Sequence, residues 1–196
     1  TQPGQFVHIS VSGILAMRRP ISVMSVDKEN GTFDLLYKIV GEGTRQLADR
    51  KIGDMLSVIG PIGNGFQMTD KKNPLLIGGG VGMPPIIAIA QNIKDNNYFS
   101  PYVILGSEVP FPFDSIASNL GGFHSSKIHT MPLLEEWGIQ AGLTSLQSFD
   151  GVYKGYVTGL AKEYLESLSE KDLLNVEIYT CGPHPMLEAV SKLAKD

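Results

Sequence analysis

The sequence predicts two domains of different class. Residues 1–70 are expected to form a small antiparallel β-barrel, and residues 71–196 an α/β domain built on a Rossmann-like parallel sheet. In the first part, short alternating apolar runs are separated by closely spaced turns, a pattern typical of small barrels. After Asp70-Lys71-Lys72-Asn73, apolar strand candidates alternate with amphipathic helix candidates, which indicates a parallel, doubly wound sheet.

The composition is that of a folded globular protein, and it argues against several classes of function. Hydrophobic residues make up 42% of the 196 residues and charged residues 18%, which fits a chain with a real core. The net charge of −4 predicts no nucleic-acid partner. No apolar segment is long enough to span a membrane and no signal-peptide pattern is present, so we expect no membrane partner and a cytoplasmic protein.

The first half reads as strands joined by turns, with one short helix. The strongest strand candidate is Thr32–Val40, which alternates along its length and follows an Asn30-Gly31 hairpin turn. Thr44 is the expected N-cap of the helix. The expected elements are strands over 6–11 and up to 26, a strand over 32–40, a helix over 45–49, a strand over 55–59 and a loop over 60–65.

The second half is organised around one stretch that reads as strand, glycine turn and helix. Leu75–Ile77 is a short apolar run, Gly78–Gly82 contains four glycines, and Pro84 and Pro85 suit the first turn of a helix. Bare backbone amides before a helix can bind a phosphate, but a plain turn that needs glycine for packing explains the stretch equally well. The prolines also prevent a fit to the G-x-G-x-x-G fingerprint.

The remaining elements of the second half follow the same alternation, and the sheet's carboxyl edge is the expected place for a ligand. Residues 138–155, rich in Gly, Ser and Gln, give no clear prediction. The expected strands are 75–77, 102–105, 128–131 and 176–180, and the expected helices are 85–94, 158–168 and 185–194.

Three short stretches have residue types that could bind a cofactor. Arg19 could clamp a pyrophosphate while the nearby hydroxyl of Ser22 bonds a ring nitrogen. Gly41-Glu42-Gly43-Thr44 could cradle a phosphate with its amides. Standing alone, these two stretches are better explained as a surface arginine before a turn proline and as a tight turn. Cys181 could lie beside a reacting ring or pack as a small hydrophobe.

Other reactive side chains are not arranged as a catalytic or metal site. A single cysteine excludes a disulfide within this chain and any four-thiolate zinc or iron–sulfur site built from it alone. His184 has no partner at ligand spacing, so we predict that it is structural or faces solvent and that there is no metal site. No carboxylates pair for acid–base work, and no Gly-x-Ser-x-Gly elbow is present.

Taken together, the stretches resemble the ferredoxin reductase-like superfamily of flavin and nicotinamide oxidoreductases. Arg19-Pro20-Ile21-Ser22 is similar to its Arg-x-Tyr-Ser motif, residues 79–85 to its Gly-Gly-x-Gly-x-x-Pro motif, and residues 181–186 to its Cys-Gly-x-x-x-Met motif. Within it, the chain most resembles the electron-transfer subunits of class 1B dihydroorotate dehydrogenases. Leu36-Tyr37-Lys38, the Val-Gly-x-Gly-Thr of residues 40–44 and the Gly-Pro-x-Gly-Asn-Gly-Phe of residues 60–66 match that family.

The resemblance implies FAD on the barrel, NAD(H) on the second domain, and electron transfer for a dihydroorotate dehydrogenase catalytic subunit of the FMN type in pyrimidine biosynthesis. It implies two candidate catalytic residues, Ser22 at the flavin N5 edge and Cys181 near the nicotinamide. The implied FAD-binding residues are Arg19, Pro20, Ile21, Ser22, Leu36, Tyr37, Lys38, Gly43 and Thr44. The implied NAD-binding residues are Gly79, Gly80, Gly82, Pro84, Cys181, Gly182 and Pro183.

Two departures from the family leave alternatives open. The family carries a four-cysteine run that binds a 2Fe–2S cluster, and those cysteines are absent from this chain. The residues expected to form the first barrel strand are also absent. The alternatives are a related NAD(P)H:ferredoxin-type reductase or hydrogenase γ-like subunit, and, in another class, a non-catalytic assembly subunit that has lost a cofactor.

Overall fold

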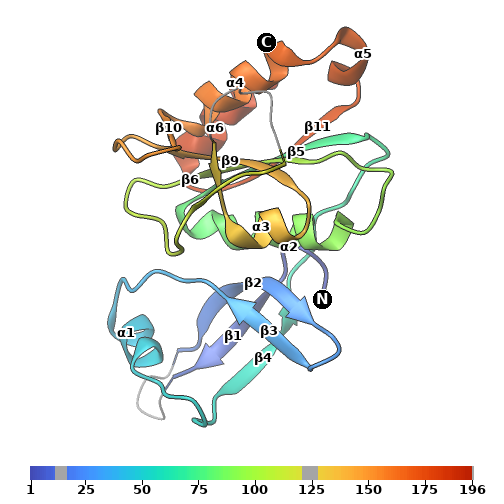
Figure 1. The fold of residues 1–196 in the computed structure, drawn as a ribbon. Helices are drawn as coiled ribbons and strands as arrows, with labels where there is room; N and C mark the ends of the chain where they lie inside the picture. The colour runs from blue at the N-terminus through green and yellow to red at the C-terminus, as the bar shows by residue number, and fades with distance from the viewer. Residues whose placement is uncertain (12–16, 121–127, 196) are drawn as a thin grey trace.

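The computed structural model describes residues 1–11, 17–120 and 128–195. The chain forms two halves, each built on its own β-sheet, and Figure 1 shows them stacked one above the other. The N-terminus lies near the junction between the halves, and the described chain ends at the far side of the C-terminal half. This two-part arrangement, with an antiparallel sheet followed by a parallel one, confirms the predicted fold class.

The N-terminal half is a barrel-like antiparallel sheet of four strands in the order β3-β2-β1-β4. Its elements are β1 (Phe6–Ser10), β2 (Arg19–Asp27), β3 (Thr32–Leu35), α1 (Glu42–Ala48) and β4 (Ser57–Ile62). Buried and less buried residues alternate along β1 and β2, because successive side chains of a strand point to opposite faces. One face therefore packs with Leu47 of α1 into a small core, whose other members are Val7, Ile9, Val11, Ile21 and Val23.

Three boundaries in this half differ from the prediction. The strand expected over residues 55–59 is β4, which continues to Ile62 into the stretch 60–65 that was expected to be a loop. The strand expected over residues 32–40 ends at Leu35, because its ladder with β2 ends at the Val23–Leu35 pair. The following residues run to α1 without ladder pairing, and Val40 is 77% exposed although the sequence pattern alternates through it. The helix starts earlier than expected, with Gly41 as N-cap, so Thr44 lies inside its first turn. The Thr44 hydroxyl accepts hydrogen bonds from the amides of Val40 and Gly41 at 3.0 and 3.2 Å.

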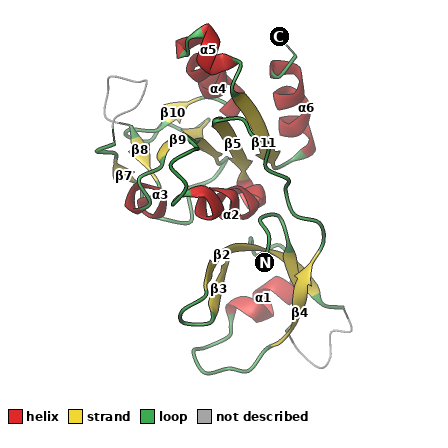
Figure 2. Cartoon of the chain, turned by 90° about the vertical axis from the view of Figure 1, so that its right-hand side faces the viewer, coloured by secondary structure: helices red, strands yellow, loops and turns green. Residues whose placement is uncertain are grey.

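The C-terminal half is a parallel sheet of five strands in the order β10-β9-β6-β5-β11. Helices α2 and α3 cover the face toward the N-terminal half, and α4 and α6 cover the other face (Figures 1 and 2). The sheet strands are β5 (Asn73–Gly79), β6 (Tyr102–Gly106), β9 (Gln140–Ser145), β10 (Tyr153–Lys154) and β11 (Val176–Cys181). The helices are α2 (Met83–Ile93), α3 (Pro132–Glu136), α4 (Val157–Ser167), α5 (Glu170–Leu173) and α6 (His184–Leu193).

One predicted strand does not belong to this sheet. Residues 128–131 contain only the two-residue strand β8 (His129–Thr130), which pairs antiparallel with β7 (Ile116–Ala117). Its expected place is taken by β9, from the stretch that gave no clear prediction. Residues Ala141–Ser145 are buried, and a Cβ on Gly142 would lie 2.7 Å from Leu160 Cδ2 and 2.9 Å from the Tyr102 hydroxyl. In the sequence Gly142 suggests a loop, but in the structure it lets α4 pack closely against β9.

Helix α2 is the element that joins the halves. It lies between the two sheets in both views, and Met24 of β2 packs against the core cluster that includes α2. No helix in the described parts of the chain is long and apolar enough to cross a bilayer.

Candidate functional site

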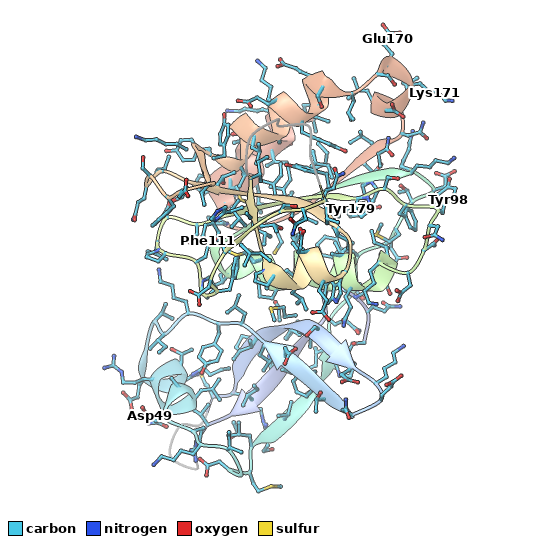
Figure 3. The ribbon with its side chains drawn as sticks, in the orientation of Figure 1. Asp49, Tyr98, Phe111, Glu170, Lys171 and Tyr179 are labelled. Atoms are coloured by element: carbon cyan, nitrogen blue, oxygen red, sulfur yellow. The ribbon has the colours of Figure 1, made fainter. Side chains whose placement is uncertain are left out.

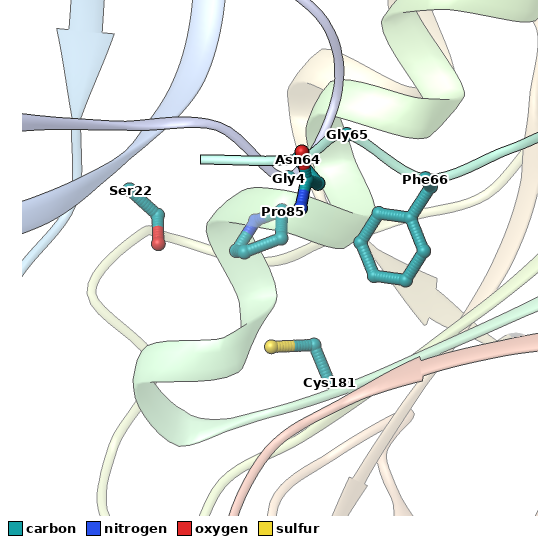
Figure 4. A pocket seen from close by; sticks show the side chains of 7 residues that line it. All are labelled: Gly4, Ser22, Asn64, Gly65, Phe66, Pro85 and Cys181. Carbon is teal, nitrogen blue, oxygen red and sulfur yellow. The ribbon is translucent and has the colours of Figure 1, made fainter. Parts of the chain in front are cut away.

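A cavity of about 390 Å³ lies between the two halves. The N-terminal half and the linker contribute Gly4, Ser22, Asn64, Gly65 and Phe66, and the C-terminal half contributes Pro85 and Cys181 (Figure 4). The two residues predicted to be catalytic, Ser22 and Cys181, therefore face one space although they are far apart in the sequence. Figure 4 shows the Cys181 sulfur below Pro85, on the side of the cavity where Ser22 lies.

Strand alternation directs Ser22 into this cavity. Ile21 and Val23 are 6% and 4% exposed and belong to the sheet core, so Ser22 between them points to the other face. The same alternation places the Ile21 side chain in the core of the N-terminal half, and Ile21 is not among the residues that line the cavity. Pro20, next to it, is exposed.

Cys181 ends β11 at the carboxyl edge of the parallel sheet, where ligands of such sheets bind. Its side chain is partly buried, and this burial raises the pKa of the thiol above its ordinary value of 9.0. The thiol is therefore protonated at neutral pH. A protonated thiol puts a small, polarizable and uncharged group at the cavity wall.

Several residues of the cavity were not predicted as site residues. Asn64, Gly65 and Phe66 lie in the Gly-Pro-x-Gly-Asn-Gly-Phe match of residues 60–66, which was the available signal for them. Phe66 lies edge-on to Tyr179 with ring centroids 6.2 Å apart, and its amide donates to the Pro3 carbonyl at 2.8 Å. Figure 3 shows Tyr179 in the C-terminal half, so the ring contact joins Phe66 to β11, whereas the amide bond joins Phe66 to the N-terminal segment.

Arg19 and Gly43, which the resemblance implies as FAD-binding residues, lie together at the start of α1. The Arg19 guanidinium covers Gly43, and a Cβ on this buried glycine would lie 2.7 Å from Cζ and 2.8 Å from Nη2. The guanidinium makes no hydrogen bond or ion pair with any other described residue. The first amides of a helix also have no partner within the helix. A guanidinium beside such donors fits a diphosphate group chemically.

The segment Leu36-Tyr37-Lys38 follows β3 and leads toward α1. Figure 1 shows this connection at the edge of the N-terminal half that faces the C-terminal half. Leu36 and Tyr37 are half-buried, Tyr37 packs against the sheet core, and Lys38 is exposed. The segment is thus on the correct side of the sheet for a ligand held between the halves.

The glycine turn after β5 has two packing roles that need no ligand. A Cβ on Gly82 would lie 2.6 Å from the Gly182 nitrogen and still closer to the Cys181 carbonyl, and a Cβ on Gly79 would lie 2.5 Å from Met186 Sδ. Gly80 is exposed and has φ of +54°, which favours glycine. Pro84 and Pro85 are both buried, and Pro85 also lines the cavity.

The amides available to a phosphate at this turn are fewer than the sequence pattern implies. Pro84 and Pro85 have no N–H, and the Met83 N–H donates to the Gly80 carbonyl. An anion here would therefore bind amides of the turn Gly80–Gly82 rather than those of the first turn of α2.

The end of β11 continues into α6 through Gly182 and Pro183. Gly182 is half-buried with Met186 beside it, and Pro183 is the exposed N-cap of α6. The His184 side chain is 82% exposed and lies 3.6 Å from Glu188, so the prediction that it faces solvent is confirmed. Among the described residues, no three His, Cys, Asp or Glu side chains gather as a metal site.

Comparison with known proteins agrees with this geometry. Residues 1–66 match the family described as Oxidoreductase FAD-binding domain. Over the whole chain, the structure is similar to the NADH-dependent reduced ferredoxin-NADP oxidoreductase, with a TM-score of 0.76 and 25% identity, of which it covers 63%. It also shares its fold with the ferredoxin reductase in carbazole 1,9a-dioxygenase, with a TM-score of 0.74 and 22% identity, of which it covers 56%.

Curated relatives extend over the full chain. It is 35% identical to the "Dihydroorotate dehydrogenase B (NAD(+)), electron transfer subunit" of Bacillus cereus (strain B4264), across 100% of this chain and 68% of the relative. The protein of the same name from Bacillus anthracis (strain A0248) has the same identity and coverage. With both candidate catalytic residues in one cavity and this similarity along its whole length, the chain belongs to the family of dihydroorotate dehydrogenase B electron transfer subunits.

Proposed function

We propose that this chain is an FAD-dependent NAD(H) oxidoreductase that transfers electrons for a dihydroorotate dehydrogenase catalytic subunit of the FMN type, in pyrimidine biosynthesis. The single observation that carries the proposal is the cavity between the halves, which is lined by Ser22 of the N-terminal half and Cys181 of the C-terminal half. The names of the relatives, which specify NAD(+) and electron transfer, support it.

The N-terminal half would hold FAD. Arg19 and the Gly43 and Thr44 amides would bind its pyrophosphate, because a positive charge lies there beside several N–H donors. Among the described residues, none forms a hydrogen bond or ion pair with the guanidinium. Leu36, Tyr37 and Lys38 would lie along the flavin side of the molecule. Ser22 would donate to or accept from a nitrogen at the ring edge, while Phe66 and Pro85 would exclude water from the cavity.

The C-terminal half would hold the nicotinamide dinucleotide. The Gly80–Gly82 turn offers amides for phosphates, and Cys181, Gly182 and Pro183 would lie near the nicotinamide. When bound, the two cofactors supply the redox chemistry by exchanging a hydride, and the protein contributes orientation and electrostatics. The neutral Cys181 thiol would contact the ring without adding a charge that opposes either redox state. A 2Fe–2S cluster does not fit the residues of this chain, whose only cysteine is Cys181.

A reconstitution assay with the catalytic subunit tests the proposal. The FAD-loaded chain should reduce NAD⁺ with electrons from dihydroorotate when an FMN-type catalytic subunit is added, and should not do so alone. Failure of every such pairing, with an FAD-loaded chain that accepts electrons from NADH, would contradict the proposed partner.

The second candidate function is an NAD(P)H:ferredoxin-type reductase or hydrogenase γ-like subunit. The shared fold with ferredoxin reductases favours the former. Rapid reduction of a ferredoxin by NADH or NADPH through this chain, without a catalytic subunit, would support this alternative. A colourless chain that takes up no FAD would instead indicate the non-catalytic assembly subunit.

A further inference from the structure

The side-chain amide of Gln91 joins the two halves by a pair of hydrogen bonds. Gln91 lies on α2, and its Oε1 accepts from the Val26 amide of β2 at 2.9 Å. Its Nε2 donates to the Val26 carbonyl at 3.1 Å. Both bonds are partly buried. The two bonds engage both the N–H and the C=O of Val26, as a neighbouring strand would. They therefore fix both the distance between α2 and β2 and their relative orientation at this point.

This contact connects two elements that line the cavity, one from each half. Strand β2 places Ser22 in the cavity and, four positions later, presents Val26 to Gln91. Helix α2 starts beside the cavity with Pro85 and reaches Val26 with Gln91, two turns further on. Both elements are held in place by their neighbours. Strand β2 pairs with β1 up to Ser22 and with β3 from Val23 onward, and α2 is buried along most of its length.

We infer that Gln91 is a positioning residue for electron transfer between the cofactors: it holds β2 against α2 and so sets the separation of the Ser22 and Cys181 walls of the cavity. The inference rests on the proposed function, in which the reacting rings meet between these walls. Met24 supports the role, since it packs against the core that includes α2 but gives no directional bond. Apolar contacts oppose separation of the halves. The paired hydrogen bonds are directional, so they also oppose a shift of β2 along α2.

The test compares Gln91→Leu and Gln91→Glu with the control Asn92→Ala, a change at the exposed neighbour on the same helix. Leu removes both bonds, whereas ionised Glu keeps the acceptor for the Val26 amide and loses the donor. The first readout is amide hydrogen exchange in the chain without nucleotides. Exchange at the Val26 amide should be fastest in Gln91→Leu, intermediate in Gln91→Glu, whose second carboxylate oxygen faces the Val26 carbonyl, and unchanged in Asn92→Ala.

The second readout is flavin reduction by NADH in a single turnover, measured in the FAD-loaded chain. Gln91→Leu should lower the rate at saturating NADH by about tenfold or more, because misplacement by about 1 Å can cost two orders of magnitude. The rate of flavin reduction in Gln91→Glu should lie between those of Gln91→Leu and the wild type. The dissociation constants of FAD and NADH should change less than about twofold, since no group that binds either cofactor is altered.

Two different failures can be told apart. Wild-type protein that binds FAD and NADH without flavin reduction would overturn the proposed function itself. Normal wild-type reduction, with Gln91→Leu as fast as Asn92→Ala, would overturn only the positioning role. If Gln91→Leu does not fold, Gln91→Glu decides: a rate equal to that of Asn92→Ala overturns the inference, and a lower rate at unchanged affinity supports it.

Discussion

At the scale of single residues, β2 divides its side chains between a core and a cavity. Ile21 and Val23 stabilise the sheet, while Ser22 is left for a ligand. The sequence motif Arg19-Pro20-Ile21-Ser22 does not distinguish these roles, because the buried face of a strand depends on which side its neighbours cover. Period-two alternation could have assigned Ile21 to the core once Val7 and Ile9 were taken as its partners.

Gly43 gives a prediction that separates cofactor binding from stability. A Cβ there would meet the Arg19 guanidinium, so Gly43→Ala should displace this side chain from the proposed pyrophosphate site. We expect FAD affinity to fall by about tenfold, the loss of roughly one charge-assisted hydrogen bond. The stability of the chain should hold or rise by up to about 1 kcal/mol, because alanine favours helices over glycine. FAD fluorescence titration and thermal unfolding measure the two effects.

The matched control for Gly43 is Ala48→Gly at the other end of α1. Ala48→Gly lowers helix propensity by about as much as Gly43→Ala raises it, and it does not approach Arg19. FAD affinity should therefore change little while the stability of the chain falls. Equal FAD affinities for wild type and Gly43→Ala would contradict the assignment of Arg19 and Gly43.

Cys181 gives a prediction about pH. Because burial raises the pKa of its thiol, the folded chain should react with iodoacetamide more slowly than the urea-unfolded chain at about pH 8. The rate should rise with an apparent pKa above 9.0. The same shift stabilises the fold below the ordinary thiol pKa, and this contribution is lost as the pH rises through the folded pKa.

The alkylation experiment needs only the rate of thiol modification against pH, with Cys181→Ser as the unreactive control. A native thiol that reacts faster than the unfolded one would show a depressed pKa. Cys181 would then be a thiolate near neutral pH, which would contradict the neutral, protonated thiol proposed to line the cavity.

At the scale of elements, the contact of η1 (Gly80–Gly82) with the end of β11 determines the shape of the site. Gly82 packs on backbone atoms of Cys181 and Gly182, which cannot rotate away as a side chain can. Gly82→Ala should therefore destabilise the chain by about 3 kcal/mol or more, the upper range for overpacking. Urea unfolding measures this loss.

Gly80→Ala is the comparison for that prediction. A Cβ at Gly80 meets nothing within 4 Å, so the main cost is its positive φ, about 1–2 kcal/mol. A smaller loss for Gly82→Ala than for Gly80→Ala would show that the turn can move away from β11.

Prediction from sequence succeeded for elements with strong local patterns. It failed for segments whose structure depends on whether a neighbouring strand pairs with them. The run at β5 and the stripe of α2 were placed correctly because both are buried and periodic. Residues 36–40 alternate like a strand but have no ladder partner beyond Leu35. Conversely, β9 has glycine, threonine and serine at buried positions, and only its neighbours β6 and β10 make it a strand.

The candidate site was predicted in part for the same reason. Motifs identified Ser22 and Cys181, but no local pattern shows that two distant motifs share a cavity. The contributions of Gly4, Phe66 and Pro85 depend on how the halves pack. The bond between Gln91 and Val26 likewise joins two residues whose partnership arises only in the folded chain.

At the scale of the whole molecule, the two surfaces that we propose to bind nucleotides belong to the two halves, which meet at the cavity. The N-terminal half contributes Ser22 to the cavity and holds Arg19 against Gly43 at the start of α1. The C-terminal half contributes Cys181 at the end of β11, and α2 lies between the two sheets. The central claim is that these surfaces hold two dinucleotides with their rings in contact.

Anaerobic mixing of the FAD-loaded chain with one equivalent of NADH tests this claim most directly, with the visible flavin absorbance as the signal. The account predicts rapid bleaching of the flavin bands in a single turnover, with no other protein present. Flavin bands that stay unchanged, although both nucleotides bind, would contradict it.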